Sequence, residues 1–277
     1  MTKKENNSNR LEQQEDSFYK LSIQVSLNGL SFCILDTIGK RLALSHSLRF
    51  NQELSPYDLQ RELRESLRVN GVLEYRFSEV VAIHRNALFS LVPQALFSRD
   101  DLANYLKFNA KILPTDHLDY DSIDGLDAVN VYVPFANVNN YLYDLFGEFE
   151  FKHTATVLLE TLVKLPANGT GEICYVHLAE GQMDMTVFSG KKMQYFNSFS
   201  VGTGEDIMYY LLFAIEQLGL DPATIKLRFL GEIEAGDATY DLAARYIENI
   251  SIFVPSGEPY ASVGSEEDID FTLINSL

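Results

Sequence analysis

The chain contains an internal repeat, and this repeat constrains the fold more than any other feature of the sequence. Residues 172–218 show apolar alternation with a period of two over three short stretches, followed by apolar residues at helical spacing. Adding 151 to the residue numbers of the earlier stretch 21–50 reproduces the strand pattern, and the helical spacing recurs over 59–67 with an offset shorter by three residues. The matched pairs include Ile23 with Cys174, Phe32 with Met183, and Lys40 with Lys191. A single offset across three predicted strands and both turns favours a duplicated β-β-β-α unit over a chance match of alternating patterns.

The composition is that of a globular, acidic protein. Apolar residues make up 46% of 277, and the net charge is −17. Such a surface repels a nucleic-acid duplex, and no apolar run approaches the length of a membrane span. Cys33 and Cys174 both fall inside predicted strands and are expected to be core residues rather than a disulfide or metal pair. The polar N-terminus has no secretory leader pattern, so we expect a cytoplasmic protein.

Composition also divides the chain into domains. We expect residues 1–17 to be a disordered tail and residues 18–166 to form a first domain. The Pro- and Gly-containing linker at 166–171 precedes a second domain over 172–255. Residues 256–277 form an acidic C-terminal tail, in which 271–274 could pair with a sheet edge.

The order of elements in each half reads β-β-β-α-β-α-β. In the first half, strands are expected at 19–28, 30–36, 41–50, 77–84, 87–97, 129–134 and 148–152, with helices at 55–70, after Ser98, and at 137–146 and 155–165. Ser55 is the expected N-cap of the first helix, with a proline at its first position. Each half is therefore predicted to be an α/β domain with a mixed sheet flanked by helices.

Two polar clusters in the first half have functional and structural interpretations. His84, Arg85 and Asn86 directly follow a predicted buried strand; they could form a site, but we favour a strand exit in contact with solvent. The carboxylates of the turn-rich stretch 113–127 fit no EF-hand loop, so we expect a solvated loop there rather than a calcium site.

The arrangement of two β-β-β-α-β-α-β halves resembles tandem ribonuclease-H-like domains, as in the superfamily of actin, sugar kinases and heat-shock chaperones. The chain looks most like bacterial actin-like proteins of cell division and pilus assembly. There, a strand runs through a Gly pair into a helix, as residues 200–207 do here. Residues 227–233 resemble the late adenosine-contacting strand and turn of that family. The layout is also similar to that of an uncharacterised bacterial family. The resemblance covers roughly residues 19–255.

The resemblance implies that two hairpin turns cradle the phosphates of Mg-ATP, and the residues at these turns depart from the expected pattern. The usual first motif is Asp-x-Gly-x-Thr, but the aligned residues 26–30 read Ser-Leu-Asn-Gly-Leu. In the second half, His177 stands where the second Asp would be. Leu230 replaces the first residue of the Gly-Gly pair that lets adenosine approach. The candidate nucleotide-contacting residues are Ser26, Asn28, Gly29, His177, Glu180, Gly181, Gly202, Thr203, Gly204 and Gly231.

The turn at 202–204 precedes a predicted helix, and a helix N-terminus is a ready anion site. Glu205 and Asp206 occupy the first turn of this helix, however, and would already satisfy its dipole. We expect Thr203 to be the N-cap. No metal-ligand spacing and no catalytic residue is predicted, although the offset also leaves open a Ser26 nucleophile with a His177 base.

The sequence therefore favours a non-catalytic protein of actin-like fold, without a cofactor, that acts as a cytoplasmic interaction or scaffold module. Its protein partner is not specified by the sequence, and self-association into a homodimer through a sheet edge is one option. Aromatic residues of the helix after the Gly turn are candidates for the partner face: Tyr209, Tyr210 and Phe213. The alternative is an ATP-dependent kinase or ATPase that uses Mg-ATP with unusual metal ligands, or a protein that binds nucleotide without hydrolysis.

Overall fold

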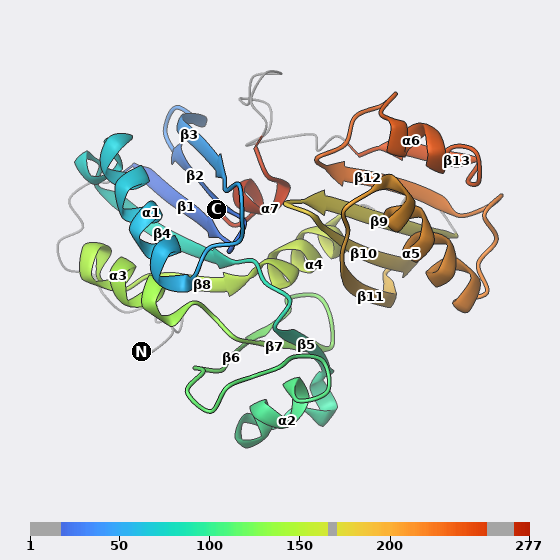
Figure 1. The fold of residues 1–277 in the computed structure, drawn as a ribbon, viewed down its shortest axis with the longest axis horizontal. Coiled ribbons are helices and arrows are strands. Elements are labelled where there is room, and N and C mark those ends of the chain that lie inside the picture. Colours follow the sequence, from blue (N-terminus) through green and yellow to red (C-terminus); the bar gives the residue numbers. More distant parts are fainter. Residues whose placement is uncertain (1–17, 166–170, 254–268) are drawn as a thin grey trace. The chain divides into compact units, whose positions relative to one another are not determined.

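The computed structural model describes residues 18–165, 171–253 and 269–277. Predictions for residues 1–17, for the linker at 166–170 and for 254–268 lie outside this part of the chain. The described residues form two compact units. Unit 1 contains the described residues up to Glu160 together with residues 269–277, and unit 2 contains those from Thr161 to Phe253. Figure 1 shows the helices and strands of each unit.

The sheet of unit 1 has the strand order β3-β2-β1-β4-β8. Strands β1, β2 and β3 form an antiparallel meander, whereas β4 and β8 run parallel to β1. The bounds are β1 Tyr19–Val25, β2 Gly29–Asp36, β3 Arg41–Arg49, β4 Phe77–His84 and β8 Glu150–His153. The sequence predicted all five of these strands.

Helices α1 (Pro56–Val69) and α3 (Ala136–Phe146) pack on this sheet, and their apolar faces form one core with the inward side chains of β1 and β2. Ser55 caps α1 as predicted, and its hydroxyl accepts a hydrogen bond from the Asp58 N–H at 3.2 Å. Helix α4 (Thr154–Lys164) directly follows β8. The division between the units falls within this helix.

A small insertion lies between β4 and β8. It contains a second sheet with the order β5-β7-β6, covered by α2 (Leu102–Leu106). Its strands are β5 Phe89–Pro93, β6 Asp119–Ser122 and β7 Ala128–Tyr132. The expectation of a solvated loop over 113–127 is wrong at β6, because Asp121 is buried and pairs in the sheet with Asn130.

The sheet of unit 2 repeats the topology of unit 1, with the order β11-β10-β9-β12-β13. Its strands are β9 Glu172–Ala179, β10 Gln182–Ser189, β11 Lys192–Ser200, β12 Lys226–Gly231 and β13 Asn249–Ile252. Helices α5 (Gly204–Gln217) and α6 (Ala238–Ala243) contribute apolar side chains to its core. The tandem ribonuclease-H-like architecture predicted from the repeat is confirmed.

The last described element is α7 (Phe271–Asn275), a short helix that packs on β1 and β2 of unit 1. The suggestion that 271–274 pairs with a sheet edge is wrong. Asp270 caps this turn of helix by accepting hydrogen bonds from the N–H groups of Thr272 and Leu273. Among the described residues, no helix is long and apolar enough to cross a membrane.

Candidate functional site

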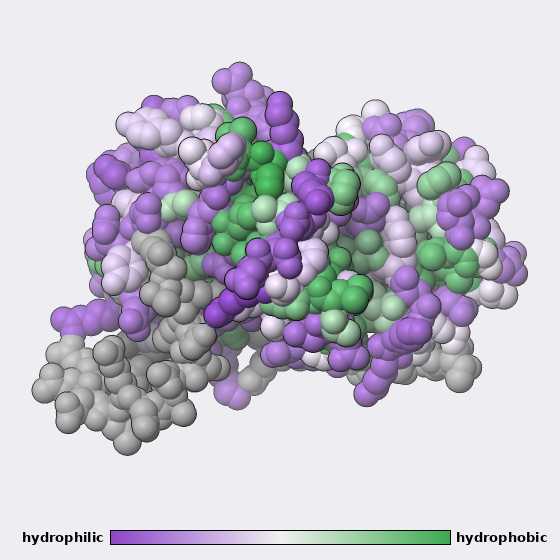
Figure 2. All heavy atoms as spheres, turned by 90° about the horizontal axis from the view of Figure 1, so that it is seen from below, coloured by the Kyte–Doolittle hydropathy of each residue, from purple (hydrophilic) through white to green (hydrophobic). Residues whose placement is uncertain are grey.

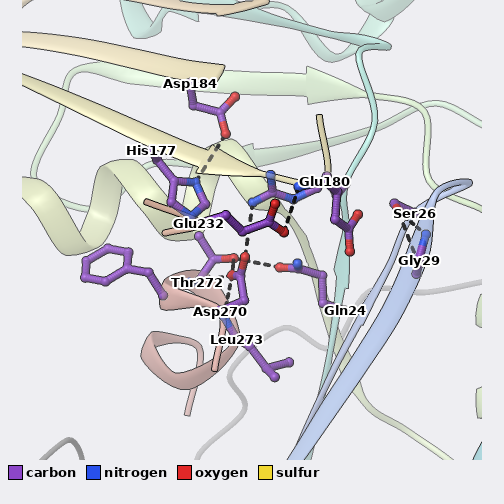
Figure 3. A network of polar contacts seen from close by, with 12 residues as sticks. Gln24, Ser26, Gly29, His177, Glu180, Asp184, Glu232, Asp270, Thr272 and Leu273 are labelled. Atoms are coloured by element: carbon purple, nitrogen blue, oxygen red, sulfur yellow. Dashed lines mark hydrogen bonds and ion pairs between the residues drawn. The ribbon is translucent and has the colours of Figure 1, made fainter. Parts of the chain in front are cut away.

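The first hairpin turn of unit 1, between β1 and β2, is closed by the side chain of Ser26. Its hydroxyl oxygen accepts hydrogen bonds from the N–H groups of Asn28 (3.1 Å) and Gly29 (2.9 Å), and the hydroxyl lies 3.1 Å from the Gly29 carbonyl (Figure 3). Ser26 itself is buried. The two amides that a phosphate would need at this turn are therefore bound to the chain's own oxygen.

Strand pairing corrects the alignment of the two halves. In unit 1, Gln24 pairs with Ser31, and in unit 2 His177 pairs with Asp184, which is an offset of 153 on both strands. The offset of 151 holds only for the third strand of each meander, β3 and β11. Each of these strands has a β-bulge, and the unpaired residues of the two bulges, Ala43 and Gln194, are 151 apart. The difference arises because four residues join β2 to β3, whereas two residues join β10 to β11.

This shift changes which residues occupy equivalent positions. Gln24, not Ser26, is the counterpart of His177, and Ser26 is the counterpart of Ala179. The expected equivalence of Ser26 and His177 is therefore wrong, and the nucleophile-and-base interpretation that depended on it loses its basis. With the corrected register, the first position of the Asp-x-Gly-x-Thr pattern is held by the side-chain amide of Gln24 in unit 1 and by the imidazole of His177 in unit 2.

The second hairpin turn, between β9 and β10, is formed by Glu180 and Gly181, which both have positive φ angles, of 53° and 75°. This is the geometry of a two-residue hairpin turn. The N–H of Glu180 donates a hydrogen bond of 3.1 Å to a carboxylate oxygen of Glu232, a residue just after β12 (Figure 3). A carboxylate of the protein is thus held where the amide of this turn would meet a phosphate.

Gly231 has a packing role at the same end of the sheet. A Cβ atom at this position would lie 2.1 Å from the Leu178 carbonyl oxygen, and the residue has a φ of 86°. The next residue, Glu232, donates its N–H to the same carbonyl at 2.7 Å. Only glycine lets β12 approach β9 this closely, and this approach places the Glu232 side chain at the turn.

The third candidate anion site is the turn before α5, and it is satisfied by Asp206. One carboxylate oxygen of Asp206 accepts hydrogen bonds from the N–H groups of Gly202 and Thr203, each at 3.0 Å. The Thr203 hydroxyl in turn accepts from the Asp206 N–H, which completes a capping box and confirms Thr203 as the N-cap. The hydrogen bond from the Gly202 amide, followed by those from Thr203, lowers the pKa of Asp206.

Gly204, at the start of α5, makes room for the neighbouring helix. A Cβ atom there would lie 2.8 Å from the Thr239 hydroxyl oxygen of α6. The Gly-Thr-Gly turn is therefore explained by a helix cap and a helix–helix contact.

His177 and Asp184 face each other on neighbouring strands and are both buried, with 3.4 Å between Nδ1 and a carboxylate oxygen (Figure 3). A pair of this kind is compatible with a structural hydrogen bond or with proton transfer. Over the described residues, no group of three or more His, Cys, Asp or Glu side chains has the arrangement of a metal site. Asp36 lies at the far end of β2 from the first hairpin turn and accepts hydrogen bonds from the N–H groups of Ile38 and Gly39.

The polar trio after β4 is built into the interior of unit 1. His84 lies 2.9 Å from the Asn139 amide oxygen and accepts a hydrogen bond from the Phe135 N–H, whereas Asn86 bonds Val133 and Leu88. The sequence pattern of three polar residues at a strand end indicated none of these four partners. Arg85 is also buried.

Sequence reasoning missed a buried carboxylate in unit 1. Asp121 accepts hydrogen bonds from the His153 N–H at 2.9 Å and from the Thr156 hydroxyl at 2.8 Å, and its second oxygen lies 3.3 Å from the Tyr132 hydroxyl. Burial is the main cause that raises the pKa of Tyr132 well above its usual value. The only signal in the sequence was the alternation of polar and apolar residues around Asp121, which its acidic neighbours obscured.

These features define the fold class, and comparison with solved structures agrees with it. A protein of Bacteroides thetaiotaomicron with an actin-like ATPase fold and unknown function is 19% identical, with a TM-score of 0.73, over 88% of this chain and 94% of that chain. A chain of the PilM-PilN type IV pilus biogenesis complex is 12% identical, with a TM-score of 0.54, over 88% of this chain and 89% of its own length. The protein therefore has an actin-like ATPase fold.

The family is shown by a family model described as "Protein of unknown function (DUF3822)", which matches residues 8–250. The chain belongs to this family. A search of curated protein sequences gave no match.

Proposed function

We propose that this protein is a non-catalytic member of the actin-like ATPase fold, that it has lost nucleotide binding, and that it acts as a protein-interaction or scaffold module. A cytoplasmic location remains a prediction from the sequence.

The observation that carries the proposal is common to three turns. At each turn a side-chain oxygen accepts the hydrogen bonds of backbone amides. The acceptor is Ser26 at the first hairpin turn, Glu232 at the second hairpin turn and Asp206 at the turn before α5. A nucleotide phosphate would have to replace these internal acceptors and would gain little, because each amide already has a partner. At two of the three turns the internal acceptor is a carboxylate, so a phosphate would also be repelled.

The absence of carboxylates at two hairpin positions also supports the loss of nucleotide binding. The chain has Gln24 and His177 where the fold family has its metal-binding carboxylates, and neither is a hard anionic ligand for Mg²⁺. The net charge of −17 adds long-range repulsion of a triphosphate. The residues present thus do not fit Mg-ATP, and we assign no catalytic step to it.

An interaction role is supported by apolar surface and by one structural relative. On α5, Tyr209 and Phe213 are 64% and 51% exposed and stack on each other, whereas Tyr210 is half-buried against Phe199. Figure 2 shows apolar areas at the surface among hydrophilic side chains. The relative was solved as part of the PilM-PilN complex, which is an assembly of proteins. A second copy of this chain is the simplest partner for the Tyr209–Phe213 pair.

Calorimetric titration and thermal melting with Mg-ATP, ADP and a non-hydrolysable analogue test the loss of nucleotide binding. We expect no saturable heat and no rise in melting temperature at millimolar ligand. A ligand at a hundred times its dissociation constant stabilises the folded state by about 2.7 kcal/mol, so binding would be visible. Saturable binding that strengthens in Glu232→Ala would place nucleotide at the second turn and overturn the proposal. Nucleotide binding that Glu232→Ala leaves unchanged would also contradict the proposal and would mean that the nucleotide binds away from the second hairpin turn.

Sedimentation at increasing protein concentration tests self-association. We expect the wild type to form dimers in the micromolar range and the Tyr209→Ser/Phe213→Ser variant to remain monomeric. The control is Tyr57→Ser, because Tyr57 is also exposed (75%) but lies on α1 of unit 1. A wild type that stays monomeric at every concentration, or dimers that survive the double substitution, would exclude this face as the contact between copies.

A further inference from the structure

The C-terminal helix α7 is buried to an unusual degree for an element of five residues. Its side chains from Phe271 to Ile274 are at most 5% exposed. It packs on β1 and β2, the central strands of unit 1. An isolated turn of helix is unstable in water, so these contacts must hold it in place.

A polar pair anchors the start of this helix. The Thr272 hydroxyl oxygen lies 2.6 Å from the amide oxygen of Gln24, and both side chains are buried (Figure 3). The same hydroxyl contacts the carboxylate of Asp270. Because a hydroxyl has one proton, the two contacts are satisfied together when the Gln24 amide presents its NH₂ group to Thr272.

A second anchor is ionic. The guanidinium of Arg85 lies 3.6 Å from a carboxylate oxygen of Asp270, with side-chain exposures of 2% and 14%. Arg85 follows β4, and its backbone N–H donates a hydrogen bond to the carbonyl of Val25 at the end of β1. This bond fixes the backbone of Arg85 at Val25, the residue that follows Gln24 on β1. A buried guanidinium is stabilised by anionic partners, and Asp270 of the C-terminal segment is one of them.

A third contact fixes the register of the segment on the strand. The hydroxyl oxygens of Ser22 and Ser276 are 2.7 Å apart. Ser22 and Gln24 lie two residues apart on one face of β1, a spacing of about 6.7 Å. Thr272 and Ser276 are separated by one turn of helix, a rise of about 6 Å. The two spacings match, so one face of the strand accepts one face of the helix at both points.

From these contacts we propose that unit 1 contains a peptide-binding site formed by Ser22, Gln24 and Arg85, and that the chain's own segment 270–276 is its resident ligand. The site recognises a carboxylate that caps a short helix, a hydroxyl two residues later, and a second hydroxyl one turn further on. Because Gln24 holds the position equivalent to His177, the bound segment covers the strand end where the fold family would bind Mg-ATP.

The test uses the full-length protein and a fluorescently labelled peptide with the sequence of residues 269–277. In the wild type the resident segment competes with the peptide, whereas the Asp270→Ala/Thr272→Val variant has a weakened resident segment. We expect the variant to bind the peptide at least ten times more tightly than the wild type does. Arg85→Met added to the variant should abolish this binding. A peptide carrying the Asp270→Ala and Thr272→Val changes is the control and should bind neither protein.

A second measurement needs no variant and therefore does not depend on its folding. Hydrogen exchange of the wild type should show protected amides at Thr272 and Leu273, and excess unlabelled peptide should accelerate their exchange, whereas the control peptide should not. Equal affinity of the peptide for wild type and folded variant, or binding that persists in Arg85→Met, would overturn the proposal. Exchange at Thr272 and Leu273 as fast as in the free peptide would overturn it too.

Discussion

The carboxylate of Glu232 accepts a hydrogen bond from the backbone N–H of Glu180, at 3.1 Å, across 52 residues of sequence. This bond joins the β9–β10 hairpin turn to the end of β12. It uses the amide that would otherwise be available to an anion at this turn. The turn is therefore internally satisfied, and its stability depends on a side chain from another strand.

We expect Glu232→Ala to lower the free energy of unfolding of unit 2 by about 1 kcal/mol, the usual value of one net hydrogen bond. Glu232→Gln retains an acceptor oxygen and should lose less than half of that. Urea unfolding of the three proteins measures the difference. If Ala and Gln prove equally destabilising, the carboxylate charge rather than the hydrogen bond would be the stabilising factor.

Gly231→Ala should be among the most destabilising single substitutions in unit 2. The added methyl would lie 2.1 Å from the Leu178 carbonyl oxygen and would require a positive φ at a non-glycine residue. Gly236→Ala is the matched control, because Gly236 has a φ of 94° but no atom within 4 Å of its Cβ position. The control should cost about 1–2 kcal/mol from backbone strain alone.

In Gly231→Ala, the steric clash with the Leu178 carbonyl should lower the free energy of unfolding by about 1–3 kcal/mol beyond the backbone strain. This is the usual cost of overpacking. Denaturant midpoints of the two variants give the difference directly. Equal midpoints would mean that β12 can move away from β9 without loss.

Asp206 should make the stability of unit 2 depend on pH in the acid range. Its pKa is lowered in the folded protein, chiefly by the Gly202 amide, so its contribution is present above the ordinary Asp pKa and is lost as the pH falls through the lower, folded value. The stability difference between wild type and Asp206→Asn should therefore be constant from pH 7 to about 5 and should narrow below about pH 4.

Glu205→Gln is the control for Asp206, because Glu205 also lies in the first turn of α5 but is not part of the capping box. Thermal melts from pH 3 to 7 measure both differences. A constant difference for Asp206→Asn over the whole range would contradict the role of its charge.

Most of the fold could be predicted from the sequence because it depends on local patterns. Apolar alternation identified the three strands between Tyr19 and Arg49, adjacent apolar residues identified Phe77–His84, and Ser55 and Thr203 marked the starts of α1 and α5. These signals arise from burial of one face and from capping, which act within a few residues.

The site was harder to predict because it depends on register and on distant partners. Alternation has a period of two, so a shift of two residues between the halves leaves every apolar match intact, and Ser26 was paired with His177 in place of Gln24. The partners Glu232 for Glu180 and Thr272 for Gln24 are 52 and 248 residues away. No local pattern indicates such contacts, and an isolated carboxylate in a sequence is usually exposed.

The two cysteines offer one reporter in each unit. Burial raises the pKa of Cys33, on β2, to about 12, and raises that of Cys174, on β9, further still. Both thiols should stay unreactive toward a thiol reagent at pH 8 while the protein is folded and should react fully in denaturant. With Cys174→Ala the remaining thiol reports the opening of unit 1, and with Cys33→Ala it reports that of unit 2. Rapid labelling of either thiol without denaturant would contradict its burial.

The same thiols should reduce stability at alkaline pH. A thiol whose pKa is raised by folding stays protonated in the folded state, whereas in the unfolded state it ionises near pH 8.5, so stability falls as the pH rises above that value. At pH 9.5 the loss is about 1.4 kcal/mol for each thiol. Between pH 7.5 and pH 9.5, the free energy of unfolding of the wild type should therefore fall by about 1.4 kcal/mol more than that of Cys174→Ala does. Urea unfolding at the two pH values measures this, and parallel losses in the two proteins would show that the Cys174 thiol ionises in the folded state.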